Sequence, residues 1–263
     1  MTLPALILAA GRGSRLGELT ANSPKGMTRL AGRPLLEWQR LALASASLDP
    51  IAAIAGYQAY QVEQVIPVAF ENANWERTNM VATLACGASW LATTGAIVSY
   101  SDIAYHPDWV RRLVEAPPAP VTLTYDKDWR RLWEMRSDDP LSDAETFRVD
   151  AAGTLLEIGG RASSIDDVRG QYMGLLRILP DGWRAMAAAL DDLEPTIRAS
   201  IDMTSLLALL IARGTTVTTV AGSGRWVEVD TPDDLSVYEQ MLTNLDRSWR
   251  HDWRWYEEKV KTL

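Results

Sequence analysis

A chain of 263 residues, 47% of them hydrophobic and 23% charged, is long enough for one large α/β domain with a buried core. Its formal net charge of −8 argues against a nucleic-acid binder, which needs a basic face, and its apolar runs are too short to cross a bilayer. The single cysteine excludes an internal disulfide and a cysteine-cluster metal site, as expected in a reducing compartment. Taken together, these features lead us to expect a soluble, cytoplasmic protein that binds neither nucleic acid nor a membrane.

The first apolar run, residues 5–8, predicts a strand that leads into a turn of small residues. Gly11 and Gly13 can take positive φ and leave room for a ligand, so successive backbone N–H groups can converge on an anion. Arg12, Arg15 and Lys25 add positive charge at the same place. The segment therefore predicts a site for a polyanion such as a triphosphate.

Two well-known phosphate loops do not fit this segment. The dinucleotide fingerprint needs glycine where Leu16 stands, and the P-loop needs Gly-Lys-Ser/Thr, whereas Lys25 here follows Pro24. A dehydrogenase is excluded for the first reason.

Strand-like and helix-like segments then alternate along the chain. A helix is expected over 33–47, a strand over 51–56, a short helix over 57–65, a small strand over 67–70, and a helix from Thr78 or Asn79 to about 93. A strand over 95–102, a helix over 107–115 and a strand over 121–125 follow. The pattern predicts an α/β fold with a Rossmann-like mixed, mainly parallel sheet flanked by helices.

The second half adds an elaboration to this pattern. Runs over 145–149 and 154–158 predict a β-hairpin, followed by a strand over 170–179, helices over 180–193 and 203–212, and strand-like runs over 215–220 and 224–230. We expect one domain over residues 1–240, with 126–175 as an insertion on the acceptor side.

A C-terminal helix is predicted from Asp234 through Lys259, so that residues 241–263 form a Trp-rich helical end. Helical spacing places Trp249, Trp253 and Tyr256 on one face. Packing of this face against the domain is the favoured interpretation, and a homodimer formed through it is the alternative.

Two acids, Asp102 and Asp230, each close an apolar strand, where open α/β sheets place their chemistry. Both fit Mg²⁺, which prefers oxygen ligands, and both fit helix caps about equally well. Glu228 lies two residues before Asp230 and points to the same side in a strand; it is a second ligand, an acceptor contact or a surface acid.

Residues Leu8–Leu16, together with Pro24 and Lys25, closely resemble the signature of nucleotidyltransferases of the sugar-nucleotide pyrophosphorylase superfamily. The resemblance implies transfer of a nucleotide from a triphosphate to a phosphorylated acceptor, with release of pyrophosphate. It also implies Asp102 and Asp230 as Mg²⁺ ligands and Arg15 and Lys25 as catalytic residues that neutralise phosphates. The implied nucleotide contacts are Leu8, Ala9, Ala10, Gly11, Arg12, Gly13, Ser14, Thr78 and Asn79.

Further segments resemble the branch of choline-phosphate and phosphonate cytidylyltransferases, namely 78–84, 100–103, 170–174, 202–206 and 226–230. On this basis the expected activity is Mg²⁺-dependent transfer of CMP from CTP to a small phosphonate or phosphocholine-like phosphomonoester. The alternatives are a sugar-1-phosphate nucleotidyltransferase using UTP or dTTP and a non-catalytic nucleotide-sensing module.

Acceptor contacts are expected from Arg77, Lys127, Trp129, Tyr172 and Glu228. Arg77 could pair with an acceptor carboxylate or phosphonate, which would favour an anionic acceptor. For Lys127, a solvated loop charge is an equally good interpretation, and for Arg77 a surface position at a helix start is the alternative.

Overall fold

The computed structural model describes residues 2–243 and 249–255 and is built on a mixed sheet of seven strands. In spatial order the strands are β12 (Val217–Gly222), β8 (Val121–Asp126), β11 (Gln171–Ile178), β6 (Ala96–Tyr100), β1 (Ala5–Ala9), β4 (Ile51–Ala55) and β5 (Val68–Glu71). Only β11 runs antiparallel to its neighbours. The mainly parallel Rossmann-like sheet predicted from the alternating pattern is confirmed.

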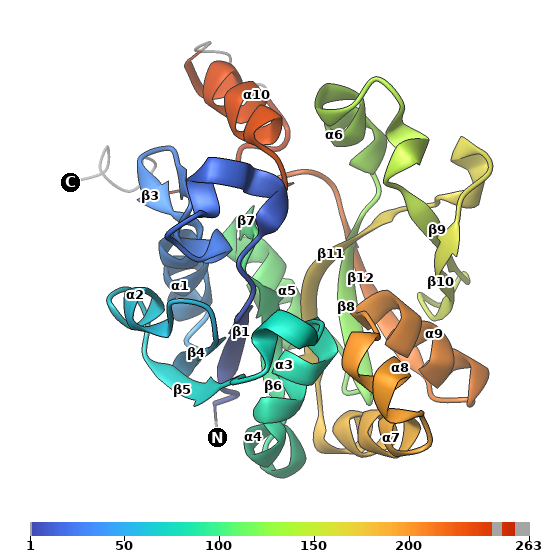
Figure 1. Ribbon diagram of the computed structural model, residues 1–263. Helices are drawn as coiled ribbons and strands as arrows, with labels where there is room; N and C mark the ends of the chain where they lie inside the picture. Colours follow the sequence, from blue (N-terminus) through green and yellow to red (C-terminus); the bar gives the residue numbers. More distant parts are fainter. Residues whose placement is uncertain (1, 244–248, 256–263) are drawn as a thin grey trace.

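Helices cover both faces of this sheet (Figure 1). Ala5 and Ile7 of β1 pack into the core beneath α1 (Leu35–Ser45), α2 (Ala59–Glu63) and α5 (Pro107–Glu115). Leu6 and Leu8 point the other way, as successive side chains of a strand must, and join the core under α3 (Met80–Cys86), α4 (Ala88–Thr93), α7 (Pro180–Asp191) and α9 (Met203–Ala212). The short α8 (Pro195–Ser200) lies against α3. Burial on both faces explains why β1 is an uninterrupted apolar run.

The strand order reverses between β1 and β6. From β1 the chain continues to β4 and β5 on one side, and then β6 pairs with β1 on the other side. Open α/β sheets bind ligands at such a switch point, beyond the carboxyl ends of the strands. In Figure 1 this is the upper end of the molecule, where the chain leaves β1 and where α6 (Trp129–Arg136) and α10 (Pro232–Thr243) lie.

An insertion between the neighbouring strands β8 and β11 carries α6 and the hairpin of β9 (Glu145–Val149) and β10 (Leu155–Arg161). The hairpin was predicted from the sequence and is confirmed, whereas no helix was predicted where α6 lies. Short 3-10 helices η4 (Pro140–Ser142) and η5 (Ile165–Asp167) flank the hairpin.

A two-stranded ribbon joins β7 (Ile103–Tyr105) to β13 (Trp226–Glu228), which is antiparallel to it. The backbone N–H of Val229 donates to the carbonyl of Asp102 over 2.9 Å. The ribbon therefore brings Asp230 beside Asp102, although the two residues are far apart in the sequence. Remaining short elements are β2 (Arg29–Leu30), β3 (Arg33–Pro34), η1 (Ser14–Thr20), η2 (Lys25–Met27) and η3 (Trp75–Arg77).

The predicted C-terminal helix is partly wrong. Helix α10 is described to Thr243, but residues 249–255 are not helical. The rings of Trp253 and Trp255 both contact Trp38 of α1, with centroids 6.0 and 5.9 Å away, and a spacing of two on one side is that of extended backbone. Trp253 is fully buried, so the expected packing against the domain holds for this segment. Tyr256 lies outside the described residues.

Among the described residues, none of the helices combines the length and the hydropathy that a membrane span requires.

Candidate active site

The glycine loop after β1 is fixed against Lys25. Gly13 has a φ of 77°, and a Cβ at this position would lie 2.7 Å from the Cβ of Lys25. The hydroxyl of Thr20 donates to the Gly13 carbonyl over 2.8 Å and holds the loop from the other side. Only glycine meets both the conformational and the steric requirement here.

Lys25 lies between the two acids that the sequence singled out. Its Nζ is 2.8 Å from Asp102 Oδ2 and also donates to Asp230 Oδ1. Burial lowers the pKa of Lys25, but the negative charges of Asp102 and Asp230 outweigh burial and raise it. Lys25 is therefore a charged ammonium that balances two carboxylates in a buried position.

Arg15 adds a second cation, with Nη2 3.0 Å from Asp230 Oδ1. Burial raises the pKa of Asp230, yet Lys25, Arg15 and Arg136 lower it further than burial raises it, so the net shift is downward. Asp230 is an ionised carboxylate.

Three carboxylates come together around this point. One oxygen each of Asp102, Glu228 and Asp230 lies within 4.8 Å of the others. Asp102 Oδ1 is buried and has no hydrogen-bond partner among the described residues. Buried polar atoms are normally paired, so this oxygen points to a missing ligand. An all-oxygen set of this kind fits Mg²⁺.

Arg136 is a site residue that was not among the predicted site residues. Its guanidinium lies 3.1 Å from Glu228 Oε2, 3.5 Å from Asp230 Oδ2 and 2.9 Å from Asp234 Oδ1. Asp234 in turn accepts from the backbone N–H of Asp230 over 2.8 Å. Arginines in the polar stretch after β8 were visible in the sequence, but their partners lie about ninety residues further on.

A cleft of 260 Å³ opens beside the glycine loop. Predicted site residues that line it are Leu8, Ala10, Gly11, Gly13, Arg15, Lys25, Thr78, Asn79 and Asp102. Asn79 caps α3 by accepting from the backbone N–H of Met80, as its sequence position suggested. Trp75, Met80, Thr83, Tyr100 and Ser101 complete the lining and were not predicted.

Three of the predicted nucleotide contacts lie away from this cleft. Ala9 is buried in the core, Ser14 is exposed at the start of η1, and Arg12 is exposed with its Nε 3.3 Å from the carbonyl of Thr20. The structure thus places six of the nine predicted nucleotide contacts in the lining and three outside it.

A second cleft of 180 Å³ adjoins the first, and Arg15, Met80 and Tyr100 line both. Tyr172 and Glu228, both predicted acceptor contacts, line this second cleft, and so does Asp230. It also contains Asp143, Glu145, Gln171, Met173, Gly174, Asp202, Met203 and Thr204. We call it the acceptor cleft, after these two predicted contacts.

The other three predicted acceptor residues line neither cleft. Arg77 is exposed at the end of η3, and Lys127 is exposed just beyond β8. Trp129 is buried, and its indole N–H donates to the carbonyl of Val168 over 3.1 Å. Trp129 therefore supports the insertion from within the core.

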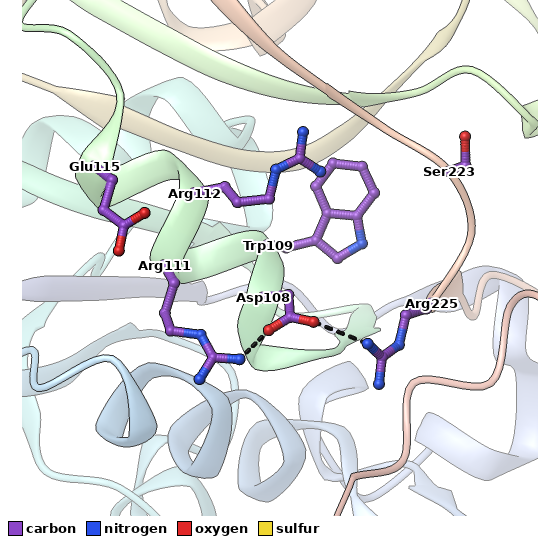
Figure 2. Close-up of a pocket in the computed structure, with 7 residues that line it drawn as sticks. All are labelled: Asp108, Trp109, Arg111, Arg112, Glu115, Ser223 and Arg225. Carbon is purple, nitrogen blue, oxygen red and sulfur yellow. Dashed lines mark hydrogen bonds and ion pairs between the residues drawn. The ribbon is translucent and has the colours of Figure 1, made fainter.

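Figure 2 shows a third cavity, of 390 Å³, around the start of α5. Arg111 and Arg225 both pair with Asp108, and the guanidinium of Arg112 lies 5.6 Å from the centre of the Trp109 ring. Its arginines are thus engaged with protein groups, and its lining shares no residue with the other two clefts.

Comparison with known proteins agrees with the resemblance found in the sequence. A phosphoglutamine cytidylyltransferase that uses CTP, from Campylobacter jejuni, is 32% identical over 249 residues, covering 89% of this chain and 98% of the relative. A 2-aminoethylphosphonate cytidylyltransferase from Lancefieldella rimae is 28% identical over 104 residues, covering 38% of this chain and 42% of the relative.

The fold is shared with solved structures. The inositol-1-phosphate CTP transferase from T. maritima superposes with a TM-score of 0.72 at 20% identity, covering 94% of this chain and 97% of that one. Residues 5–213 match the MobA-like NTP transferase domain family. The chain therefore belongs to the MobA-like NTP transferase domain family and is a nucleotidyltransferase.

Proposed function

We propose that the protein is a Mg²⁺-dependent cytidylyltransferase that transfers CMP from CTP to a small phosphomonoester or phosphonate and releases pyrophosphate. The observation that carries this proposal is the buried cluster of Lys25, Asp102 and Asp230 where the two clefts adjoin. One cleft has the glycine loop and the other has not, so the first suits the triphosphate and the second the acceptor. The cytidylyltransferase names of the relatives support CTP as the donor.

The reaction needs charge neutralisation and alignment more than covalent participation by the protein. An oxygen of the acceptor phosphate or phosphonate attacks the α-phosphorus of CTP. The bond from that phosphorus to the bridging oxygen breaks, and the electron pair leaves with pyrophosphate. Arg15 lines both clefts, so its charge serves both reacting phosphates, while the backbone of the glycine loop and Lys25 hold the triphosphate.

Asp102 and Asp230 would hold Mg²⁺, with Glu228 close enough to join them. The unpartnered Asp102 Oδ1 and the all-oxygen donor set fit that ion. When bound, Mg²⁺ supplies Lewis-acid stabilisation of the negative charge on the phosphate oxygens.

The experiment that tests the function is pyrophosphate release measured with Mg²⁺ and with EDTA, for CTP, UTP, dTTP and ATP. Each nucleotide is paired with phosphoglutamine, 2-aminoethylphosphonate, phosphocholine and sugar 1-phosphates. We expect release with CTP and with at least one of the first three acceptors, and its loss in EDTA. Pyrophosphate release only with UTP or dTTP and a sugar phosphate would overturn the proposal in favour of a sugar-1-phosphate nucleotidyltransferase. No pyrophosphate release with any pair would favour a non-catalytic nucleotide-binding module.

The metal acids give the matching variants. Asp102→Asn and Asp230→Asn should each lower kcat by about a hundredfold or more, because each removes an anionic ligand of the Mg²⁺ that would stabilise the phosphate oxygens. Asp233→Asn, an exposed acid on α10, is the control and should keep normal turnover. Circular dichroism checks that all three variants fold, and near-normal turnover of either site variant would remove that acid from the mechanism.

A further inference from the structure

The strand that carries two of the site carboxylates lies outside the main sheet. β13 pairs with β7 in a separate two-stranded ribbon of three residue pairs; it ends at Glu228 and leads directly to Asp230. Asp102, by contrast, follows β6, a central strand of the seven-stranded sheet. The place of Glu228 and Asp230 relative to Asp102 therefore depends on how the ribbon is fixed to the main sheet.

A buried carboxylate at the end of β8 makes one such connection. Asp126 is the last residue of β8 and is fully buried. Its Oδ2 accepts from the indole N–H of Trp226, the first residue of β13, over 2.8 Å. Its Oδ1 accepts from the backbone N–H of Gly224 over 3.1 Å and from that of Asp128 over 2.8 Å. One side chain of the main sheet thus bonds two points in the segment that enters the ribbon.

The three donors to Asp126 are uncharged N–H groups. His251 Nδ1 lies 3.7 Å from Asp126 Oδ2, which is beyond hydrogen-bond distance, and burial lowers the pKa of His251. The histidine is therefore a neutral neighbour at neutral pH. Because a buried carboxylate loses much free energy when a donor is removed, the bonds from Trp226 and Gly224 constrain the ribbon strongly.

The ring of Trp226 lies beside the groups that contact the acids. Trp226 and Glu228 lie on the same side of β13, since successive side chains of a strand alternate. The Trp226 ring is fully buried, and its centroid is 6.2 Å from that of Trp133. The guanidinium of Arg136 lies 4.7 Å from the centre of the Trp133 ring and pairs with the acids of the ribbon. A shift of the indole would therefore disturb both the strand and the arginine that its acids contact.

We propose that Asp126 and Trp226 are positioning residues for the transfer reaction, which hold Glu228 and Asp230 where they face Asp102. One oxygen of each of these three acids lies within 4.8 Å of the others, so a small shift of the ribbon would separate them. Asp126 and Trp226 line neither of the two clefts, so they act through the ribbon and do not touch a substrate. The inference rests on the proposed function for the role of the three acids in holding Mg²⁺.

The chemistry of Asp126 provides a variant of nearly the same shape. A carboxylate accepts hydrogen bonds at both oxygens, whereas an amide has one acceptor oxygen and one donor NH₂ group. In Asp126→Asn, either orientation of the amide sets its NH₂ against an N–H group, that of Trp226 or those of Gly224 and Asp128. Trp226→Phe is the second variant, which removes the indole N–H and keeps an aromatic ring in the core.

The kinetic test is pyrophosphate release from CTP and the acceptor that the panel identifies, over a range of Mg²⁺ concentrations. We expect each variant to lower kcat about tenfold or more, because the acids move, and to leave KM for CTP within about threefold, because other elements build the glycine loop. The Mg²⁺ concentration for half-maximal activity should rise roughly tenfold. In the double variant the amide no longer opposes an indole N–H, so the two losses should not multiply.

Hydrogen exchange of the metal-free protein tests the positioning without turnover. The backbone N–H of Val229 donates to the carbonyl of Asp102 and so reports the contact between the ribbon and the end of β6. This amide and the paired amides of β13 should exchange about tenfold faster in each variant than in the wild type. Exchange of β1 in the same samples reports any loss of stability of the whole domain, so only the excess over β1 counts.

Trp38→Phe is the matched control. Trp38 is a buried residue of α1 outside both clefts, and it too donates an indole hydrogen bond of 2.8 Å, to the carbonyl of Leu30. This variant should keep kcat within about threefold of normal and leave exchange of the Val229 amide unchanged.

The positioning roles would be overturned by normal kcat in both ribbon variants, by equal losses in Trp38→Phe, by losses that multiply in the double variant, or by unchanged exchange of the Val229 amide. A wild type that releases no pyrophosphate with any pair would overturn the proposed function itself. Exchange of the Val229 amide would then still decide whether Asp126 and Trp226 fix the ribbon.

Discussion

At Gly13, backbone conformation and side-chain packing impose the same requirement. The residue combines a φ of 77° with a Cβ position only 2.7 Å from Lys25. Gly13→Ala therefore strains the backbone and also pushes Lys25 away from Asp102 and Asp230. We expect an unfolding free energy about 1–3 kcal/mol lower and a kcat roughly tenfold to hundredfold lower, since misplaced charge is costly for catalysis. Urea unfolding and pyrophosphate release measure the two effects.

Gly17 provides the matched control, because its φ is also positive, at 57°, but a Cβ there would meet no atom within 4 Å. Gly17→Ala should cost comparable stability through backbone strain alone and leave kcat within about threefold of normal. If both alanine variants lowered kcat alike, the contact between Gly13 and Lys25 would have no special role in the site.

At the scale of elements, helix α6 delivers Arg136 to three acids. The Arg136 side chain is 7% exposed, contacts Glu228, Asp230 and Asp234, and lies 4.7 Å from the centre of the Trp133 ring. Arg136→Gln leaves buried carboxylates without their counter-ion, so we expect the free energy of unfolding to fall by about 3–5 kcal/mol. Arg130→Gln on the same helix removes an exposed arginine paired with Glu134 and should cost less than about 1 kcal/mol. If urea unfolding gave equal losses of unfolding free energy for the two variants, the buried network would stabilise the fold no more than the exposed ion pair does.

Which elements could be predicted from the sequence depends on how local their causes are. The glycine loop, the strands ending near Asp102 and the cap of α3 at Asn79 are recognisable because each pattern lies within a few residues. Arg136 was not selected, because its partners are brought near by the ribbon of β7 and β13 rather than by sequence proximity. In the sequence alone, the spacing of Trp249 and Trp253 fits one face of a helix. The packing of Trp253 and Trp255 against Trp38 shows that the segment is extended instead.

At the scale of the whole molecule, the alternation of strands and helices was sufficient to predict a mainly parallel sheet. It could not predict the antiparallel direction of β11, because the hairpin insertion that reverses the chain between β8 and β11 carries no signal of direction. Which residues come together to line the two clefts also depends on this topology. The set of residues that lines the acceptor cleft therefore had to come from the structure, since Glu145 and Asp202, for example, lie in separate elements.

Acid stability is a property of the whole molecule to which His106 contributes. Its Nδ1 accepts from the backbone N–H of Asp108 at the start of α5. Burial, together with the charges of Arg225 and Arg111 and against an opposing effect of Asp252, lowers the pKa of His106 to about 4. The unfolded chain binds this proton near pH 6.5 and the folded chain does not until about pH 4. The contribution of His106 is therefore intact above pH 6.5 and is lost as the pH falls towards 4.

His106→Asn keeps a side chain that can cap α5 and removes the titration. The unfolding free energy of the variant minus that of the wild type should therefore rise as the pH falls, by on the order of 1–3 kcal/mol between pH 7 and pH 4.5. Urea unfolding at a series of pH values measures this difference. The carboxylates and His251 are present in both proteins, so their contributions cancel in the difference, although burial also lowers the pKa of His251. A difference that stays constant with pH would mean that His106 binds its proton equally well in the folded and unfolded chains.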